Sequence, residues 1–285
     1  KTLTTQKQLI CLLYGVITKC NSLNQLSKNI QFLHNKLTSI GIDEIPARST
    51  LADANANRSS EVFELIYNKL YQHYSHLLDN ESYGIITDMY GNKQVELIDS
   101  STLTLFQEVF RGAGRNSLTG VKKGGLKIHT KLPLGGVAPN LVHITESACS
   151  DETFLGQLNF TPNTIYVFDK GYANYKKWQE IDIQKSFWVT RINKNAKYEV
   201  LNEKTYTIID YADGGIISDS VIKLKNGLKA RLIVYKDPES GKVLRFVSNL
   251  FEYNALTITQ LYKYRWSIEV FFKRLKQNFQ TDYFF

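Results

Sequence analysis

Hydrophobic and polar positions divide the chain into a first part with helical spacing and a later part with strand spacing. Up to about residue 82, apolar residues recur every three or four positions, as in the series Leu26, Ile30, Leu33 and Leu37. This spacing gathers apolar side chains on one face of a helix. We therefore predict a helical N-terminal domain over residues 1–82.

From residue 83 onwards the pattern changes to short runs rich in β-branched and apolar residues. The runs are VELIDSSTLTLF, GLKIHTKLPL, LVHITES, TIYVFDKGY and SFWVTRI, and the helix-like segment ANYKKWQEI precedes the last of them. Strands interleaved with helices indicate an α/β sheet. The predicted fold class is therefore α/β, with a core that covers residues 83–192 and resumes over residues 243–285.

Residues 193–242 interrupt that core with short alternating segments. Turn-forming sequences separate these segments, at Asp213-Gly214-Gly215, Asn226-Gly227 and Asp237-Pro238. Alternation broken by such turns is typical of antiparallel hairpins. We therefore predict an inserted β-meander here, followed by a single long helix over TITQLYKYRWSIEVFFKRLKQNF.

The charge balance is basic, with a formal net charge of +8 over 285 residues. Basic surface favours a polyanionic partner such as nucleic acid, although a merely basic globular protein is an equally good explanation of charge alone. The three cysteines, at positions 11, 20 and 149, are too few and too scattered for a disulfide framework or a thiolate zinc site, so a reducing cytoplasm fits.

No apolar run approaches the roughly 18 residues that span a bilayer, and the start of the chain does not resemble a secretory signal. We therefore expect no membrane partner. The chain lacks an initiator Met and stops at TDYFF just after a predicted helix, so we expect a fragment that lacks at least its C-terminal portion.

The last predicted helix carries a polar face next to an apolar one. At about 100° per residue, its four polar residues fall within an arc of roughly 60°; they are Tyr262, Arg265, Glu269 and Lys276. The adjacent apolar stripe, which would anchor the helix on a core, consists of Leu261, Ile268, Phe272, Leu275 and Phe279. Glu269 should then lie at the edge of a buried interface. The alternative is a solvated face with ordinary helix salt bridges.

Two aspartates strengthen the functional interpretation of that helix. Asp99 and Asp169 each follow an apolar run, and an Asp at the end of a buried strand is costly unless it is solvated, paired or bound to metal. Together with Glu269 they would form an oxygen-rich site suited to Mg²⁺ or Mn²⁺. Two such ions can stabilise the attacking and leaving oxygens of an in-line phosphoryl transfer.

At these residues the sequence resembles the DDE transposases of bacterial insertion sequences, in the insertion-sequence-four group. The signature of that group, Y-(2)-R-(3)-E-(6)-K, is present without a gap as YKYRWSIEVFFKRLK, from Tyr262 to Lys276. IDSSTLTLF resembles the strand of the first Asp, VFDKGY the strand of the second, and RSTLADANANR a stretch of the helical N-terminal domain. The resemblance covers nearly the whole chain.

The resemblance implies a ribonuclease-H-like core in which Asp99, Asp169 and Glu269 are the catalytic metal ligands, holding Mg²⁺ or Mn²⁺, with two ions expected. It implies a β-rich insertion between the second Asp and the Glu. By the same analogy, Tyr262, Arg265 and Lys276 would contact phosphates at the transposon end. The planar guanidinium of Arg265 suits that task, because it can grip a phosphate with two hydrogen bonds.

The activity implied is strand cleavage and strand transfer at insertion-sequence ends by a homodimer assembled on double-stranded DNA, in the bacterial cytoplasm at the nucleoid. The partners would be the terminal inverted repeats and the target DNA. Some members of the group flip a base onto a Trp of the β insertion while forming a DNA hairpin. The predicted meander contains Tyr198, Tyr206 and Tyr211 but no Trp, so the resemblance does not extend to a hairpin.

Further basic residues are candidate DNA contacts. The segment from Arg111 to Lys131 contains six basic residues and no acidic one, and we single out Arg115, Lys122 and Lys123 within it. On the last helix Lys273 joins them. A solvated basic hairpin is the alternative, just as the helical domain over residues 1–82 either binds DNA or only packs.

Two other functions compete with the transposase hypothesis: a DNA-binding remnant without catalysis, and a ribonuclease-H-like nuclease that cleaves without strand transfer. Other polar residues are explained by structure alone. We interpret His129 and His143 as strand histidines of the core or surface, and Asp151 as the residue that starts a helix.

Overall fold

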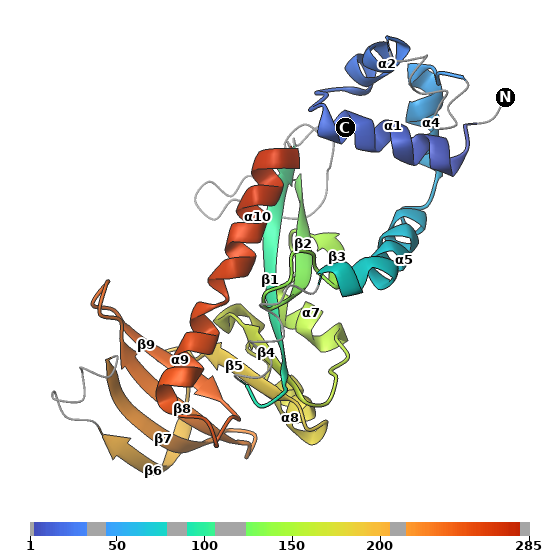
Figure 1. The fold of residues 1–285 in the computed structure, drawn as a ribbon. Helices are drawn as coiled ribbons and strands as arrows, with labels where there is room; N and C mark the ends of the chain where they lie inside the picture. The colour runs from blue at the N-terminus through green and yellow to red at the C-terminus, as the bar shows by residue number, and fades with distance from the viewer. Residues whose placement is uncertain (1–2, 33–43, 79–89, 106–123, 206–214, 280–285) are drawn as a thin grey trace.

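The computed structural model is a mixed α/β structure built on one large sheet (Figure 1). The residues that it describes are 3–32, 44–78, 90–105, 124–205 and 215–279. The predicted α/β class is confirmed, and the mixed sheet with its helices is consistent with a ribonuclease-H-like transposase domain. Among the described residues, no helix is both long and apolar enough to cross a bilayer.

The N-terminal part of the described chain is helical. Its helices are α1 (Thr5–Ile17), α2 (Leu23–Gln31), α4 (Arg48–Asn57) and α5 (Glu61–Leu78). Thr4 and Ser22 start the first two, because the side-chain oxygen of each accepts a hydrogen bond from a backbone N–H of the first turn. Helices α1, α2 and α4 share a small apolar core that contains Cys11, Leu26 and Leu51. Leu33 and Leu37 of the predicted stripe lie outside the described residues.

The sheet has nine strands in the order β3-β2-β1-β4-β5-β9-β8-β7-β6. The first five strands in the chain are β1 (Gln94–Leu105), β2 (Gly124–Pro133), β3 (Leu141–Glu146), β4 (Thr164–Phe168) and β5 (Phe187–Arg191). Strand β4 pairs in parallel with both β1 and β5, whereas β2 and β3 are antiparallel neighbours. All five residues of β4 are buried, as expected for a central strand covered on both faces.

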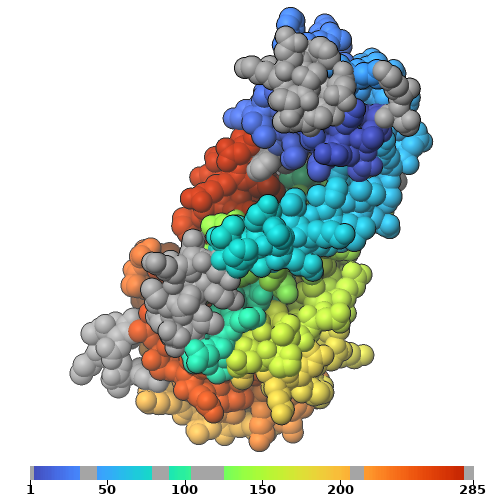
Figure 2. All heavy atoms as spheres, turned by 45° about the vertical axis from the view of Figure 1, so that its right-hand side comes forward, coloured from blue at the N-terminus to red at the C-terminus, as the bar shows by residue number. Residues whose placement is uncertain are grey.

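The segment of the predicted meander continues this same sheet. Its strands β6 (Tyr198–Thr205), β7 (Ile216–Leu224) and β8 (Lys229–Lys236) pair antiparallel with one another, and β9 (Val243–Ser248) joins β8 to β5. Gly227 turns β7 into β8 with a positive φ of 83°, a conformation that favours glycine. Figure 2 shows the N-terminal helices at one end of the molecule and these strands at the other. The division into domains at residues 82, 192 and 242 stays a prediction.

Two apolar cores cover the two faces of the sheet, and strand alternation decides which residue faces which. Leu97 and Val167 belong to the core under α9 (Ala255–Lys263) and α10 (Trp266–Phe279). Ile98 and Phe168 belong to the opposite core, which includes residues of α7 (Asp151–Gln157) and α8 (Tyr175–Ile183). Because successive side chains alternate, Asp99 faces the α10 side and Ser100 faces the α7 side.

The prediction of one long C-terminal helix is wrong. The helix ends at Lys263 and a second one begins at Trp266, so that Tyr262 lies on α9 while Glu269 and Lys276 lie on α10. At the junction the backbone tightens, because Arg265 N–H donates to Tyr262 O and Ile268 N–H donates to Arg265 O, three residues back in each case. The four signature residues therefore do not share one regular helical face.

Candidate active site

Asp99 and Asp169 are brought side by side by the register of two parallel strands. Ile98 pairs with Phe168 in the β1–β4 ladder, so the next residue of each chain segment is one of the two aspartates. Asp169 follows the end of β4, as the sequence predicts, and directly precedes the 3₁₀ turn η2 (Lys170–Tyr172). Asp99 lies midway along β1, which continues to Leu105, so the prediction that it ends a strand is wrong.

Glu269 completes an acidic cleft from the first turn of α10. The side chains of Asp99, Asp169 and Glu269 all line one cleft of about 580 Å³, together with Arg265 and residues farther along α10. The three carboxylates come from β1, from the residue after β4 and from α10, which are far apart in the chain. The structure therefore brings together the three residues that the sequence singles out.

Cations and a phenol hold the carboxylates in place. Arg265 bridges two of them, with Nη1 2.5 Å from Asp99 Oδ2 and Nη2 2.5 Å from Glu269 Oε1. Tyr262 donates its hydroxyl to Asp169 Oδ1 at 2.7 Å, and Arg191 Nη2 lies 3.1 Å from the same oxygen. The guanidinium carbons of both arginines lie 5.5 Å from the centre of the Tyr262 ring. The acidic cleft is thus neutralised within the protein itself.

The two aspartates have opposite pKa shifts. Burial raises the pKa of Asp99 to about 6, against the opposing effect of Arg265, and the charges of Glu269 and Asp169 add to the rise. Burial also acts to raise the pKa of Asp169, but the hydrogen bonds from Tyr262 and the Lys170 backbone, with the charge of Arg191, hold it below its usual value. Asp169 is therefore the readily ionised member of the pair.

Arg191 is a site residue that the sequence interpretation missed. It ends β5, which runs parallel to β4, and it alternates with Phe187 and Val189 so that it faces the α9 side. A signal was present in the sequence, because SFWVTRI places a single cation at the end of an apolar strand that follows the strand of Asp169. Such a cation needs a partner, and the neighbouring strand end supplies one.

The predicted DNA-binding cations other than Arg265 fall into three groups. Lys273 and Lys276 line the acidic cleft, and Lys276 Nζ donates to Thr102 O at 3.0 Å. Arg115, Lys122 and Lys123, as well as Arg111, lie outside the described residues. Lys127, from the same basic segment, is turned inward, because its Nζ donates to Cys149 O at 2.7 Å and its side chain is only 15% exposed.

The donor chemistry of the cleft fits a divalent cation such as Mg²⁺, since three carboxylates face one space. In the structure, the positions of Asp99 and Glu269 are fixed by their ion pairs with Arg265. Within the described ranges, no group of three or more His, Cys, Asp and Glu residues stands in a metal-holding arrangement. A cation that took Asp99 Oδ2 and Glu269 Oε1 would displace Arg265 from both carboxylates.

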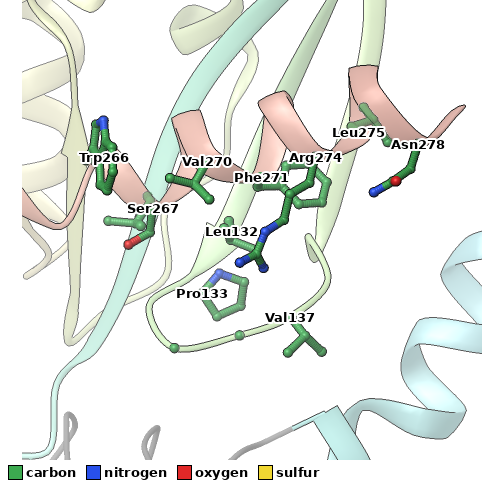
Figure 3. Close-up of a pocket in the computed structure, with 13 residues that line it drawn as sticks. Leu132, Pro133, Val137, Trp266, Ser267, Val270, Phe271, Arg274, Leu275 and Asn278 are labelled. Atoms are coloured by element: carbon green, nitrogen blue, oxygen red, sulfur yellow. The ribbon is translucent and has the colours of Figure 1, made fainter. Parts of the chain in front are cut away.

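The other side of α10 borders a different kind of cavity (Figure 3). This cavity of about 490 Å³ lies between α10 and the β2–β3 turn, and it is lined by apolar residues that include Leu132, Val137 and Phe271. Trp266, at the start of α10, is 67% exposed at its edge. Ile268 and Phe272 of the predicted anchoring stripe are buried, whereas the side chain of Phe279 lies outside the described residues. Helix α10 therefore separates an acidic cleft from an apolar one.

Comparison with known proteins gives a consistent picture. The sequence model of the transposase DDE domain matches residues 90–283, which include all three carboxylates of the cleft. A domain of unknown function matches residues 1–43. The "Putative transposase y4zB" of Sinorhizobium fredii (strain NBRC 101917 / NGR234) is 27% identical over 250 residues, which make up 84% of this chain and 65% of that protein.

The "Probable transposase for insertion sequence element IS5377" of Geobacillus stearothermophilus is 24% identical over 195 residues, 65% of this chain and 48% of that protein. The chain thus spans less than two thirds of the length of each of these curated relatives.

Proposed function

The chain belongs to the transposase DDE domain family, and on that premise we propose that it cleaves and joins DNA at insertion-sequence ends, with Asp99, Asp169 and Glu269 as its metal ligands. One observation carries the proposal: the three carboxylates line a single cleft although they come from β1, from the end of β4 and from α10. The relatives named as transposases support the same activity class.

The three carboxylates would hold two ions of Mg²⁺ or Mn²⁺. When bound, the cations supply charge that stabilises the attacking and leaving oxygens of an in-line phosphoryl transfer. The protein's own part is to position the DNA strand and to release the ligands. Arg265 would exchange Asp99 and Glu269 for a DNA phosphate, which its planar fork can bind with two hydrogen bonds.

The remaining cations would hold the DNA across the mouth of the cleft. Lys273 and Lys276 lie on the exposed side of α10 beside Glu269, where they can reach phosphates on either side of the scissile bond. The resemblance assigns Tyr262 to a DNA phosphate, but we propose that it stays on Asp169 together with Arg191. Both residues would keep Asp169 ionised, because both interactions favour the charged carboxylate. Arg115, Lys122 and Lys123 remain proposed DNA contacts on the evidence of the sequence alone.

The finer assignments belong to the same proposal. They are membership of the insertion-sequence-four group through Tyr262, Arg265, Glu269 and Lys276; a ribonuclease-H-like core with residues 193–242 as its β-rich insertion; a DNA-binding role for residues 1–82; and a homodimer assembled on double-stranded DNA at the nucleoid of the bacterial cytoplasm. The net charge of +8 supports a DNA partner.

The test is cleavage and joining of terminal-repeat DNA by the full-length protein in Mg²⁺. We expect Asp99→Asn and Glu269→Gln each to lower the cleavage rate by about a thousandfold. Each variant removes a carboxylate ligand of the metal that would stabilise the charge of the transition state. Glu180→Gln is the matched control, since Glu180 is an exposed carboxylate on α8 whose described ion pair is with Lys177. Intact cleavage by either of the first two variants would refute the assignment.

The products decide between the proposal and its two alternatives. Cleaved ends with no joined product would indicate a nuclease without strand transfer. Specific binding to the terminal sequences that needs no divalent metal and is never followed by nicking would indicate a DNA-binding remnant.

A further inference from the structure

A fourth acidic residue, Asp151, lies behind the cleft on the opposite face of the sheet. It is the first residue of α7, and a carboxylate at that place is explained in part by the favourable charge interaction at a helix start. However, the N-cap task already belongs to Ser150, whose side chain accepts a hydrogen bond from the backbone N–H of Thr153. The described partners of the Asp151 carboxylate lie on β1 and β2 instead of on its own helix.

The first of these partners connects Asp151 to Asp99. Ser100 donates its hydroxyl to Asp151 Oδ1 at 2.7 Å, on the α7 side of β1. The backbone N–H of the same Ser100 donates to Asp99 Oδ1 at 2.8 Å. One residue therefore holds the Asp99 carboxylate by its backbone, while its side chain is held by Asp151.

The second connection runs to the turn behind Asp169. Gly171 lies in the η2 turn that directly follows Asp169, and a Cβ atom added there would lie 3.0 Å from Asp151 Oδ2. The Asp151 carboxylate thus packs closely against the backbone of Gly171, and a side chain at position 171 would push it away. Asp151 consequently touches the segments that follow both aspartates of the cleft.

Two side chains of β2 flank the Asp151 carboxylate. Lys127 Nζ lies 3.4 Å from Asp151 Oδ1 and also donates to Cys149 O, which tethers the ammonium. His129 Nδ1 lies 3.8 Å from the same carboxylate oxygen, and its ring stacks on Phe154 of α7 with ring centres 4.2 Å apart. The Asp151 carboxylate is thus bound to β2 as well as to β1.

We propose that Asp151 is a positioning residue of the active site, which orients Asp99 through Ser100 and supports the turn behind Asp169 through Gly171. In this proposal it acts through these two residues and is not itself a metal ligand. The inference rests on the proposed function in one respect, namely that Asp99 and Asp169 are metal ligands. Mutation of a residue that orients a metal ligand typically weakens metal binding about ten- to a hundredfold.

The experiment measures Mn²⁺ affinity of the DNA-free, full-length protein by calorimetry, with folding checked by circular dichroism. We expect Asp151→Ala and Ser100→Ala each to weaken Mn²⁺ binding about tenfold or more. The double variant should bind no more weakly than the weaker single variant, since both changes break one link. Glu152→Ala is the matched control, because Glu152 also lies in the first turn of α7 but is exposed and has no described contact with Ser100.

A merely structural role at the helix start predicts equal effects of Asp151→Ala and Glu152→Ala, and that result would overturn the inference. So would additive losses in the double variant. If Asp151→Ala does not fold, Ser100→Ala and Gly171→Ala take its place, and unchanged Mn²⁺ affinity in both would count against the inference. Asp99→Asn and Glu269→Gln separate the two proposals: if they bind Mn²⁺ normally, the metal assignment itself fails.

Discussion

At the scale of single residues, the cleft treats two neighbouring aspartates differently. Asp99 is buried and shares Arg265 with Glu269, and its pKa is raised to about 6. Asp169 accepts hydrogen bonds from the hydroxyl of Tyr262 and the guanidinium of Arg191, and its pKa is lowered. Environments that push the pKa values of adjacent carboxyls apart are a common property of catalytic pairs.

The first prediction concerns the stability of the metal-free protein against pH. Because the folded-state pKa of Asp99 lies above its ordinary value of 3.8, the folded protein keeps a proton that the unfolded chain releases between about pH 4 and about 6. The free energy of unfolding should therefore fall as the pH rises through this window, by up to roughly 3 kcal/mol for a shift of about two units. Urea unfolding in a chelator at about pH 4.5 and about pH 7 measures the fall.

Asp99→Asn serves as the reference for that measurement, since it cannot titrate. Wild type should lose stability relative to Asp99→Asn between the two pH values. Asp169→Asn is the control, because the lowered pKa of Asp169 gives a contribution that is lost only at more acidic pH. A difference between wild type and Asp99→Asn that stays constant with pH would show that Asp99 titrates normally.

At the scale of elements, the local sequence pattern predicts the strands and turns that depend on nearby residues. Apolar runs indicate the strands, and the Asn226-Gly227 turn lies where the sequence places it. The break between α9 and α10 is not predictable in this way, because YKYRW contains neither Pro nor Gly. Contacts distant in sequence accompany it: Arg265, at the junction, pairs with Asp99 across 166 residues.

The same limit applies to the candidate site. Three carboxylates are recognisable because acids beside apolar runs are conspicuous and because the helix resembles a known signature. Arg191 and Asp151 are not, since a strand-end arginine and a helix-starting aspartate are common features whose partners are visible only in three dimensions. What the sequence predicts is residue type and spacing; which cation meets which carboxylate depends on the sheet order.

The second prediction compares two glycines at opposite ends of the β7–β8 pairing. Gly215 and Gly227 both have positive φ, 75° and 83°, but a Cβ at Gly215 would lie 2.2 Å from Lys236 O whereas Gly227 has open space around it. Gly227→Ala should cost about 1–2 kcal/mol from backbone strain alone. Gly215→Ala should cost about 3–4 kcal/mol, because a steric clash is added.

Urea midpoints of the two variants measure this difference, with the wild-type denaturant dependence as the check that the unfolded state is unchanged. Equal losses in the two variants would show that the β8 backbone moves away from Gly215 at little cost. Larger loss at Gly227 would contradict the packing of this hairpin.

At the scale of the whole molecule, a protein with a net charge of +8 has an acidic cleft whose carboxylates pair with its own Arg265. Arg265 pairs with one oxygen of Asp99 and one of Glu269, so a cation that takes these two oxygens would displace the guanidinium. A released guanidinium at the cleft is free to bind a DNA phosphate. Metal and DNA should therefore bind with positive coupling, and the coupling must be equal in both directions.

The third prediction is that Ca²⁺, used instead of Mg²⁺ to slow cleavage, tightens binding of terminal-repeat duplex by about tenfold, within the usual range for coupled sites. Fluorescence anisotropy measures the dissociation constant for DNA in Ca²⁺ and in chelator. Both are measured at the same ionic strength, which excludes a general salt effect on the phosphates.

Arg265→Met should bind DNA with the same affinity in Ca²⁺ and in chelator, because no guanidinium is left to be released. Lys273→Met should weaken binding but keep the tenfold ratio, since Lys273 lines the cleft without a described pairing to the carboxylates. If Arg265→Met retains the ratio, simple neutralisation of the acidic cleft explains the coupling, and the exchange of Arg265 between carboxylate and phosphate is excluded.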